Sequence, residues 1–170
     1  MDFIALLKER LAYSDFIAED LGILTEEVRQ LLRDSALPGM KVLEFAFDES
    51  ECSDYLPHKY SENCICYAGT HDNATLKSWQ EEVSPRSLAF AREYLGVEEG
   101  DIVWAILRGG MASKAVLFVA LMQDYLGLDD SARMNTPGLS EGNWRWRATG
   151  EDFDKALAEK IARMAKIYGR

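Results

Sequence analysis

The apolar positions of the chain gather in short runs that alternate with segments of helical spacing. Four of these runs have the length and composition of buried strands. They span residues 15–20 (DFIAED), 40–47 (MKVLEFAF), 63–69 (NCICYAG) and 115–121 (AVLFVAL). Periodicity alone leaves the last run open, as either a strand or a continuation of the helix before it.

Helical spacing and end signals predict four helices. Residues 25–34 form one, with Thr25 as its cap, and 84–96 form another, with proline at its first position and glycine at its end. Residues 101–113 are predicted to be helical despite a glycine pair. The last helix lies within 151–169, where one apolar face recurs at helical spacing. That face consists of Phe153, Leu157, Ile161, Met164 and Tyr168.

Strands that alternate with helices predict an α/β fold built from parallel βα units, with residues 1–170 in one domain. Such sheets bind ligands at the carboxyl ends of their strands. Glu19 and Asp20 end the first apolar run, and His71 and Asp72 follow the third. We therefore expect functional acids at this edge of the sheet.

Composition narrows the classes of partner. The formal net charge is −10, which disfavours nucleic acid and anionic membranes but does not penalise a neutral substrate. The start of the chain lacks the pattern of a secretory signal, and the longest apolar run, 115–122, is too short to span a bilayer. Three cysteines in no framework spacing fit a reducing cytoplasm, and we expect Cys64 and Cys66 to be packing residues.

Glu19 and Asp72 form a candidate carboxylate pair. Glycoside chemistry uses two carboxyls, one protonated for the leaving oxygen and one charged. The alternative is that both are solvated loop acids. A metallohydrolase that uses His58, His71, Asp72 and Asp20 is a second alternative, although no familiar ligand spacing supports it.

Two further features remain open at this point. The segment NWRWR (143–147) alternates aromatic rings with arginines, which suits sugar stacking, RNA binding or a structural packing edge. Glu44 alternates with apolar neighbours in its run, so it either points toward the interior as a functional group or fills space there.

Several longer motifs identify a family. The segments are IAEDLG (17–22), LPGMKVLEFAFDE (37–49), YLPHKY (55–60), GTHDN (69–73), MQDYLGL (122–128) and RMNTPG…GNWRWR (133–147). In this order they resemble the carboxyl-terminal part of amylomaltase, the 4-α-glucanotransferase of glycoside hydrolase family 77. The resemblance covers nearly the whole chain.

The resemblance implies the carboxyl-terminal half of a (β/α)₈ TIM barrel, strands five to eight with their helices, with 115–121 as the eighth strand. It implies transfer of α-1,4-glucan segments between maltooligosaccharides with retention, and no cofactor or metal. Glu19 matches the general acid/base and Asp72 the transition-state stabiliser. The positions that match substrate-binding residues are Asp20, His58, His71 and Asn135. To hold its proton at neutral pH, Glu19 needs a raised pKa and therefore a partly desolvated site.

The chain departs from the family at three points. Lys59 replaces an asparagine, Ala74 replaces an acid, and the nucleophilic aspartate has no counterpart in this sequence. A complete barrel needs about 250 residues. We therefore expect a half-barrel that is inactive alone and that pairs with an amino-terminal half or with itself. The alternative function is a non-catalytic half-barrel that binds glucan or only assembles.

Overall fold

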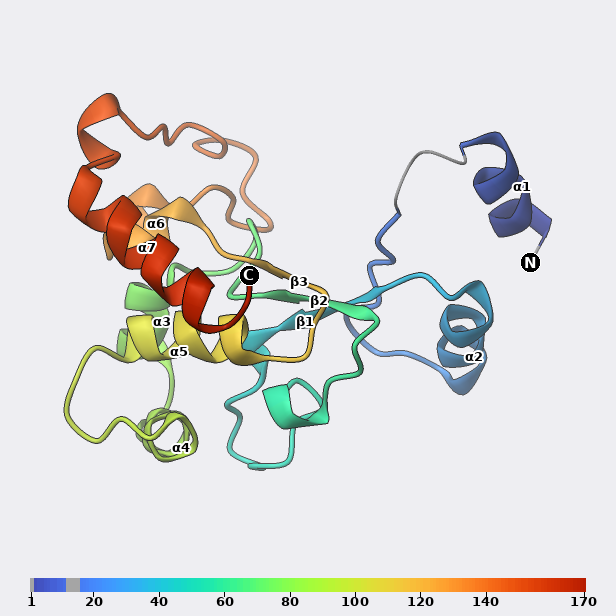
Figure 1. The fold of residues 1–170 in the computed structure, drawn as a ribbon, viewed down its shortest axis with the longest axis horizontal. Helices are drawn as coiled ribbons and strands as arrows, with labels where there is room; N and C mark the ends of the chain where they lie inside the picture. The colour runs from blue at the N-terminus through green and yellow to red at the C-terminus, as the bar shows by residue number, and fades with distance from the viewer. Residues whose placement is uncertain (1, 12–15) are drawn as a thin grey trace.

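Three short parallel strands form the centre of the fold. The computed structural model describes residues 2–11 and 16–170 (Figure 1). The strands β1 (Gly39–Val42), β2 (Cys64–Tyr67) and β3 (Leu117–Val119) lie in chain order in one sheet. Between β1 and β2 the chain forms only short 3₁₀ turns, whereas three α-helices connect β2 to the adjacent parallel strand β3. The predicted α/β class with a parallel sheet is confirmed.

The first predicted strand is absent. Asp15 lies outside the described residues, and residues 16–20 contain no strand. The backbone N–H of Ala18 donates to Pro38 O at 2.9 Å, but the N–H of Met40 donates to the Asp20 carboxylate at 2.6 Å. The Asp20 side chain therefore accepts from a backbone N–H that a β-ladder between residues 16–20 and β1 would use.

The second predicted strand is shorter than its apolar run. β1 ends at Val42, and residues Leu43–Phe45 form a 3₁₀ turn. The N–H of Glu44 still donates to Ala68 O at 3.3 Å, and the N–H of Ala68 donates to Val119 O at 2.9 Å. The segments that follow the three strands are therefore tied together at the carboxyl edge of the sheet.

Seven helices surround this sheet within the described part of the chain. They are α1 (Asp2–Arg10), α2 (Glu26–Ser35), α3 (Leu76–Glu82), α4 (Pro85–Leu95), α5 (Ile102–Ala112), α6 (Met122–Leu126) and α7 (Lys155–Ile167). In Figure 1, α1 and α2 lie to the right of the sheet and the other five to its left. The four predicted helices are confirmed, whereas helical spacing and end signals did not predict α1, α3 or α6.

The predicted end signals act at most helix termini. Ser84 Oγ accepts from the N–H of Ser87 at 3.2 Å, and Gly96 ends α4 with a φ of 67°. Thr25 occupies the N-cap of α2 as predicted, but its side chain makes no capping hydrogen bond.

The hydrophobic core lies between the sheet and four helices, α3, α4, α5 and α7. Of these, α5 contacts the other three. Cys64 and Cys66 are buried in it, which confirms their predicted packing role. On α7, Met164 is buried as predicted. The prediction for Phe153 is wrong: it precedes the helix proper and is 62% exposed.

Arg170 fastens the end of α7 to the segment that leads from α5 to β3. Its guanidinium donates to Met111 O at 3.1 Å, to Ser113 O at 2.8 Å and to Ala115 O at 2.6 Å. Carbonyls near a helix end lack intrahelical partners, so a cation satisfies them well.

Apolar side chains remain exposed at the start of β3. Val116 is 65% exposed and Leu117 is 48% exposed. β3 is an edge strand of the sheet. No helix in the described ranges is long and apolar enough to cross a bilayer.

Candidate functional site at the carboxyl edge of the sheet

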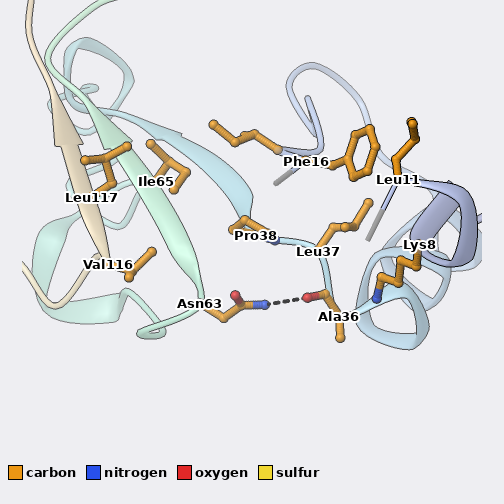
Figure 2. Close-up of a pocket in the computed structure, with 11 residues that line it drawn as sticks. Lys8, Leu11, Phe16, Ala36, Leu37, Pro38, Asn63, Ile65, Val116 and Leu117 are labelled. Atoms are coloured by element: carbon orange, nitrogen blue, oxygen red, sulfur yellow. Dashed lines mark hydrogen bonds between the residues drawn. The ribbon is translucent and has the colours of Figure 1, made fainter. Parts of the chain in front are cut away.

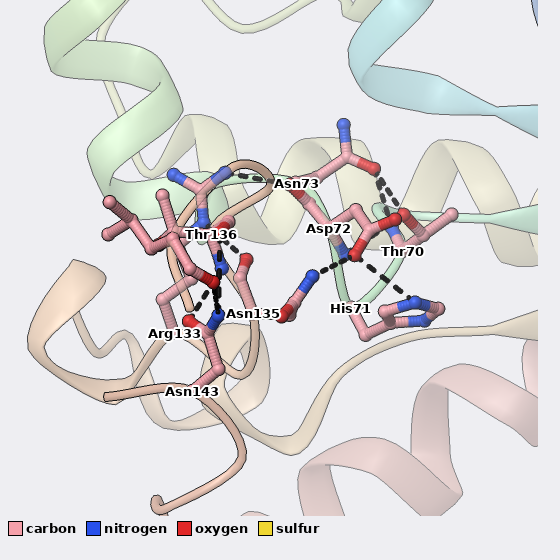
Figure 3. A network of polar contacts seen from close by, with 9 residues as sticks. Thr70, His71, Asp72, Asn73, Arg133, Asn135, Thr136 and Asn143 are labelled. Carbon is pink, nitrogen blue, oxygen red and sulfur yellow. Dashed lines mark hydrogen bonds and ion pairs between the residues drawn. The ribbon is translucent and has the colours of Figure 1, made fainter. Parts of the chain in front are cut away.

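The loop after β2 is a tight turn that presents His71 and Asp72 (Figure 3). The backbone N–H and the hydroxyl of Thr70 both donate to Asn73 Oδ1, at 2.9 and 2.7 Å. The N–H of Asp72 donates to Thr70 Oγ1 at 3.2 Å. Short polar side chains commonly bond nearby backbone in this way, and here they fix the turn.

The Asp72 carboxylate is the centre of the site. Asn135 Nδ2 donates to Asp72 Oδ1 at 2.6 Å, and His71 Nε2 lies 3.2 Å from the same oxygen. The side chains of Asp72 and His71 remain about half exposed, at 48% and 53%. The carboxylate is thus oriented by an amide and still accessible to a ligand.

Arg133 joins the two segments that form the site (Figure 3). Its guanidinium donates to Asp72 O at 2.7 Å, to Asn135 O at 3.0 Å and to the Asp130 carboxylate at 3.0 Å. The N–H of Asn135 also donates to His71 O at 3.1 Å. Five donors of fixed geometry allow one arginine to bridge several acceptors in this way.

We expect Arg133→Met to destabilise the fold by about 1 to 3 kcal/mol, because it removes the arginine donor of Asp130 Oδ2 and of two carbonyls. Urea unfolding at pH 7 measures the loss. Arg145→Met is the matched control, since Arg145 is exposed. Equal unfolding free energies for the two variants would mean that Arg133 does not hold the site together.

Two buried carboxyls lie behind the loop. Glu44 is 9% exposed and Asp124 is 1% exposed. Glu44 Oε1 and Asp124 Oδ2 have no hydrogen-bond partner among the described residues, whereas Asp124 Oδ1 accepts from the N–H of Leu76 at 2.8 Å. A Cβ at Gly69 would overlap Glu44 Oε1, so a larger residue there requires the Glu44 carboxyl to move.

Burial changes the protonation of both carboxyls. Desolvation, together with the nearby Asp124 charge, raises the pKa of Glu44 to about 8. Desolvation also raises the pKa of Asp124 to about 6, although hydrogen bonds from the backbone N–H groups of Leu76 and Leu121 lower it. Glu44 is therefore mainly protonated at neutral pH. The Glu44 carboxyl is buried behind the loop, so this side chain points toward the interior.

Glu19 lies in the segment before β1, whereas Asp72 lies in the loop after β2. The Glu19 side chain is exposed, so the desolvation expected around it is not provided by the described residues. Asp20 binds Met40 N and packs on Gly39, which places both acids beside the amino end of β1. Asp72 instead follows the carboxyl end of β2.

Comparison with known proteins assigns the chain to a family. The family model described as 4-alpha-glucanotransferase, glycoside hydrolase family 77, matches residues 1–152. This chain belongs to the 4-alpha-glucanotransferase family. The resemblance found in the sequence motifs is confirmed.

The relatives of this 4-alpha-glucanotransferase family member are longer proteins. A 4-alpha-glucanotransferase of Clostridium butyricum is 41% identical over 172 residues, covering 100% of this chain and 35% of the relative. One from Thermus thermophilus is 41% identical over 162 residues, covering 91% and 32%. The chain thus spans about a third of the length of the curated relatives it matches.

A solved amylomaltase has the same fold as this family member. The amylomaltase from Streptococcus agalactiae, in complex with acarbose, superposes with a TM-score of 0.93 at 36% identity. The match covers 99% of this chain and 34% of that one. The α/β fold with its small parallel sheet therefore corresponds to one region of an amylomaltase.

His58, another predicted site residue of this family member, contacts Tyr94. The Tyr94 hydroxyl is 3.0 Å from His58 Nδ1, and both residues line a hollow with the end of α5. Within residues 2–11 and 16–170, no group of three or more His, Cys, Asp or Glu side chains is placed to hold a metal ion. The metallohydrolase alternative therefore gains no geometric support.

A larger hollow has no residue of the polar network in its lining (Figure 2). It has a volume of about 590 Å³ and is lined mainly by apolar side chains near the amino ends of β2 and β3. The lining includes Phe16, Ile17, Leu37, Ile65 and Leu117. Its apolar lining and its position suit packing against another segment better than binding a sugar.

Sequence reasoning missed Arg133, Asp124 and the Thr70–Asn73 turn as parts of the site. Asp124 and Arg133 lie inside motifs that identified the family, but nothing in their spacing indicated their contacts. The one signal that could have indicated Asp124 is its place two residues after the apolar run 115–122.

Proposed function

We propose that this chain is the carboxyl-terminal half of the (β/α)₈ catalytic domain of a retaining 4-α-glucanotransferase. The proposed reaction transfers α-1,4-glucan segments between maltooligosaccharides. The observation that supports it best is the Asp72 carboxylate, oriented by Asn135 and His71 at the carboxyl edge of the sheet. Membership of the family supplies the reaction class.

Glu19 is the proposed general acid/base. It protonates the oxygen of the departing glucan while a carboxylate attacks the anomeric carbon, and it then takes the proton of the incoming sugar hydroxyl. The nucleophile is proposed to lie in the part of the relatives that this chain does not span. That part would also supply the desolvation that Glu19 lacks here.

Asp72 is the proposed stabiliser of the oxocarbenium-like transition state, because an accessible carboxylate offsets the positive charge that develops on the sugar ring. His71 and Asn135 are proposed to bind the same sugar, since both contact Asp72. Asp20 and His58 are retained as proposed substrate residues on the family resemblance alone.

The chain is proposed to need a partner. The exposed Val116 and Leu117, and the apolar hollow beside them, suit an amino-terminal half-barrel or a second copy of this chain. The same surface favours the second candidate function, a half-barrel that binds glucan or only assembles. No nucleic acid or membrane partner is proposed.

Disproportionation of maltotriose tests the proposal. The chain alone and its reading frame extended upstream are each incubated with maltotriose, and products are separated by chromatography. We expect glucose and longer oligomers from the extended protein only, because the chain alone lacks the nucleophile. Transfer by the 170-residue chain would contradict the half-enzyme proposal, and no transfer by either would favour the non-catalytic candidate.

A further inference from the structure

Trp144 lies next to the polar network and is half open to solvent. The centroids of its ring and the His71 ring are 5.0 Å apart, with an interplanar angle of 39°. Trp144 is nevertheless 51% exposed. A tryptophan kept for packing buries most of its large apolar area, so this position leaves much of that area unused by the described residues.

The backbone of Trp144 is held in an unfavourable conformation. Its φ is 62°, in the left-handed region that bulky side chains rarely adopt. The N–H of Trp144 donates to Met134 O at 2.6 Å, and Arg147 Nη1 donates to Trp144 O at 2.9 Å. Strain of this kind persists where the surrounding structure imposes it, and it is frequent at binding sites.

The loop that carries Trp144 is closed by its own hydrogen bonds. Asn143 Oδ1 accepts from the N–H of Thr136 at 3.0 Å, and Asn143 Nδ2 donates to Leu139 O at 2.9 Å (Figure 3). The base of the same loop is attached to the site through Asn135, which binds both His71 O and the Asp72 carboxylate. The indole is therefore positioned before any ligand arrives, which lowers the cost of binding.

An exposed aromatic ring beside a carboxylate, an amide and an imidazole combines the two kinds of contact that a sugar needs. The ring offers an apolar face, and the polar groups offer hydrogen-bond partners. A neutral ligand also suits a chain of net charge −10. Of the interpretations left open for the NWRWR segment, sugar stacking therefore fits Trp144.

We propose that the Trp144 indole is a sugar-stacking surface that binds the glucose unit next to the one held by Asp72. This inference rests on the proposed function, because it takes the ligand to be an α-1,4-glucan. It adds a binding residue that determines how a second sugar unit is held. It assigns no part of the bond-breaking chemistry to Trp144.

A titration of the 170-residue chain with maltoheptaose tests the inference without any need for activity. The ¹⁵N-labelled chain has four tryptophan indole signals, which single Trp→Phe variants assign. We expect the Trp144 indole signal and the His71 amide signal to shift together and to saturate at one dissociation constant. The Trp79 and Trp104 indole signals are expected to remain unchanged.

Variants separate the outcomes. We expect Trp144→Ala to weaken maltoheptaose binding at least about tenfold, Trp144→Phe to retain most of it, and Arg145→Ala to leave it unchanged. Shifts at His71 without a shift at Trp144, or equal binding by Trp144→Ala, would overturn this inference alone. The absence of any ligand-dependent shift would also overturn this inference, whereas maltotriose transfer by the upstream-extended protein would still support the proposed function.

A stability measurement distinguishes binding from packing. Asparagine tolerates the left-handed region far better than tryptophan. We expect Trp144→Asn to melt at a temperature no lower than that of the parent chain, while it loses maltoheptaose binding. A clear fall in melting temperature would mean that Trp144 is kept for the fold, which would contradict the inference.

Discussion

Replacing Glu19 by glutamine in the upstream-extended protein should lower glucan transfer between maltooligosaccharides by about 10²- to 10⁴-fold, the usual contribution of a general acid/base. Glutamine keeps the size of the side chain but has no proton to give to the departing oxygen. Since Glu19 is exposed in the 170-residue chain, we expect the same substitution to leave the free energy of unfolding of that chain unchanged. Initial rates with maltotriose, together with urea unfolding, measure both quantities.

A donor with a good leaving group makes this test specific. An α-maltosyl fluoride needs no proton to release fluoride, so Glu19→Gln should still give a burst of about one fluoride per active site. The second half-reaction, which needs the base, should then stall. Glu9→Gln is the matched control, because Glu9 is also an exposed glutamate near the amino-terminal end. A fluoride burst lost together with maltotriose transfer would contradict the acid/base role.

Replacing Glu44 by glutamine should stabilise the fold at high pH and leave it almost unchanged at low pH. The folded chain raises the pKa of Glu44 from 4.5 to about 8, chiefly through desolvation. Between these two values the folded chain holds a proton that the unfolded chain has released. The contribution of Glu44 to stability is therefore full below about pH 4.5, falls as pH rises, and is lost above about pH 8.

The size of this effect follows from the same shift. The loss between pH 5 and pH 8.5 is on the order of 4 kcal/mol. Glutamine mimics the protonated carboxyl and does not titrate, so the difference between variant and parent should grow with pH by that amount. Urea unfolding across this range measures it, with the exposed Glu49→Gln as control. A pH-independent difference would mean that Glu44 is ionised in the folded chain throughout.

Local chemistry explains which parts of the fold could be predicted. α4 carries its own start and stop signals, and the Cys64–Tyr67 strand is a short apolar run between polar segments. The strand predicted to include residues 16–20 is absent. Its hydrophobic pattern does not reveal that the Asp20 side chain accepts a hydrogen bond from the N–H of Met40. α6 was missed because a helix of five residues shows too little periodicity to detect.

The candidate site depends on contacts that no local pattern contains. Asp72 and Asn135 are 63 positions apart, and Arg133 reaches the backbone of Asp72 across 61. Periodicity placed Asp72 after a strand but gave it no partner, and only the family motifs suggested Asn135. The raised pKa of Glu44 likewise depends on burial and on the charge of Asp124, which α6 carries.

The contacts of Arg170 affect how the chain resists proteolysis. The guanidinium that closes α7 also fixes the segment entering β3, through three backbone carbonyls. A side chain beside α7 therefore limits local opening of the segment between α5 and β3. We expect Arg170→Ala to be digested faster in that segment than the parent chain.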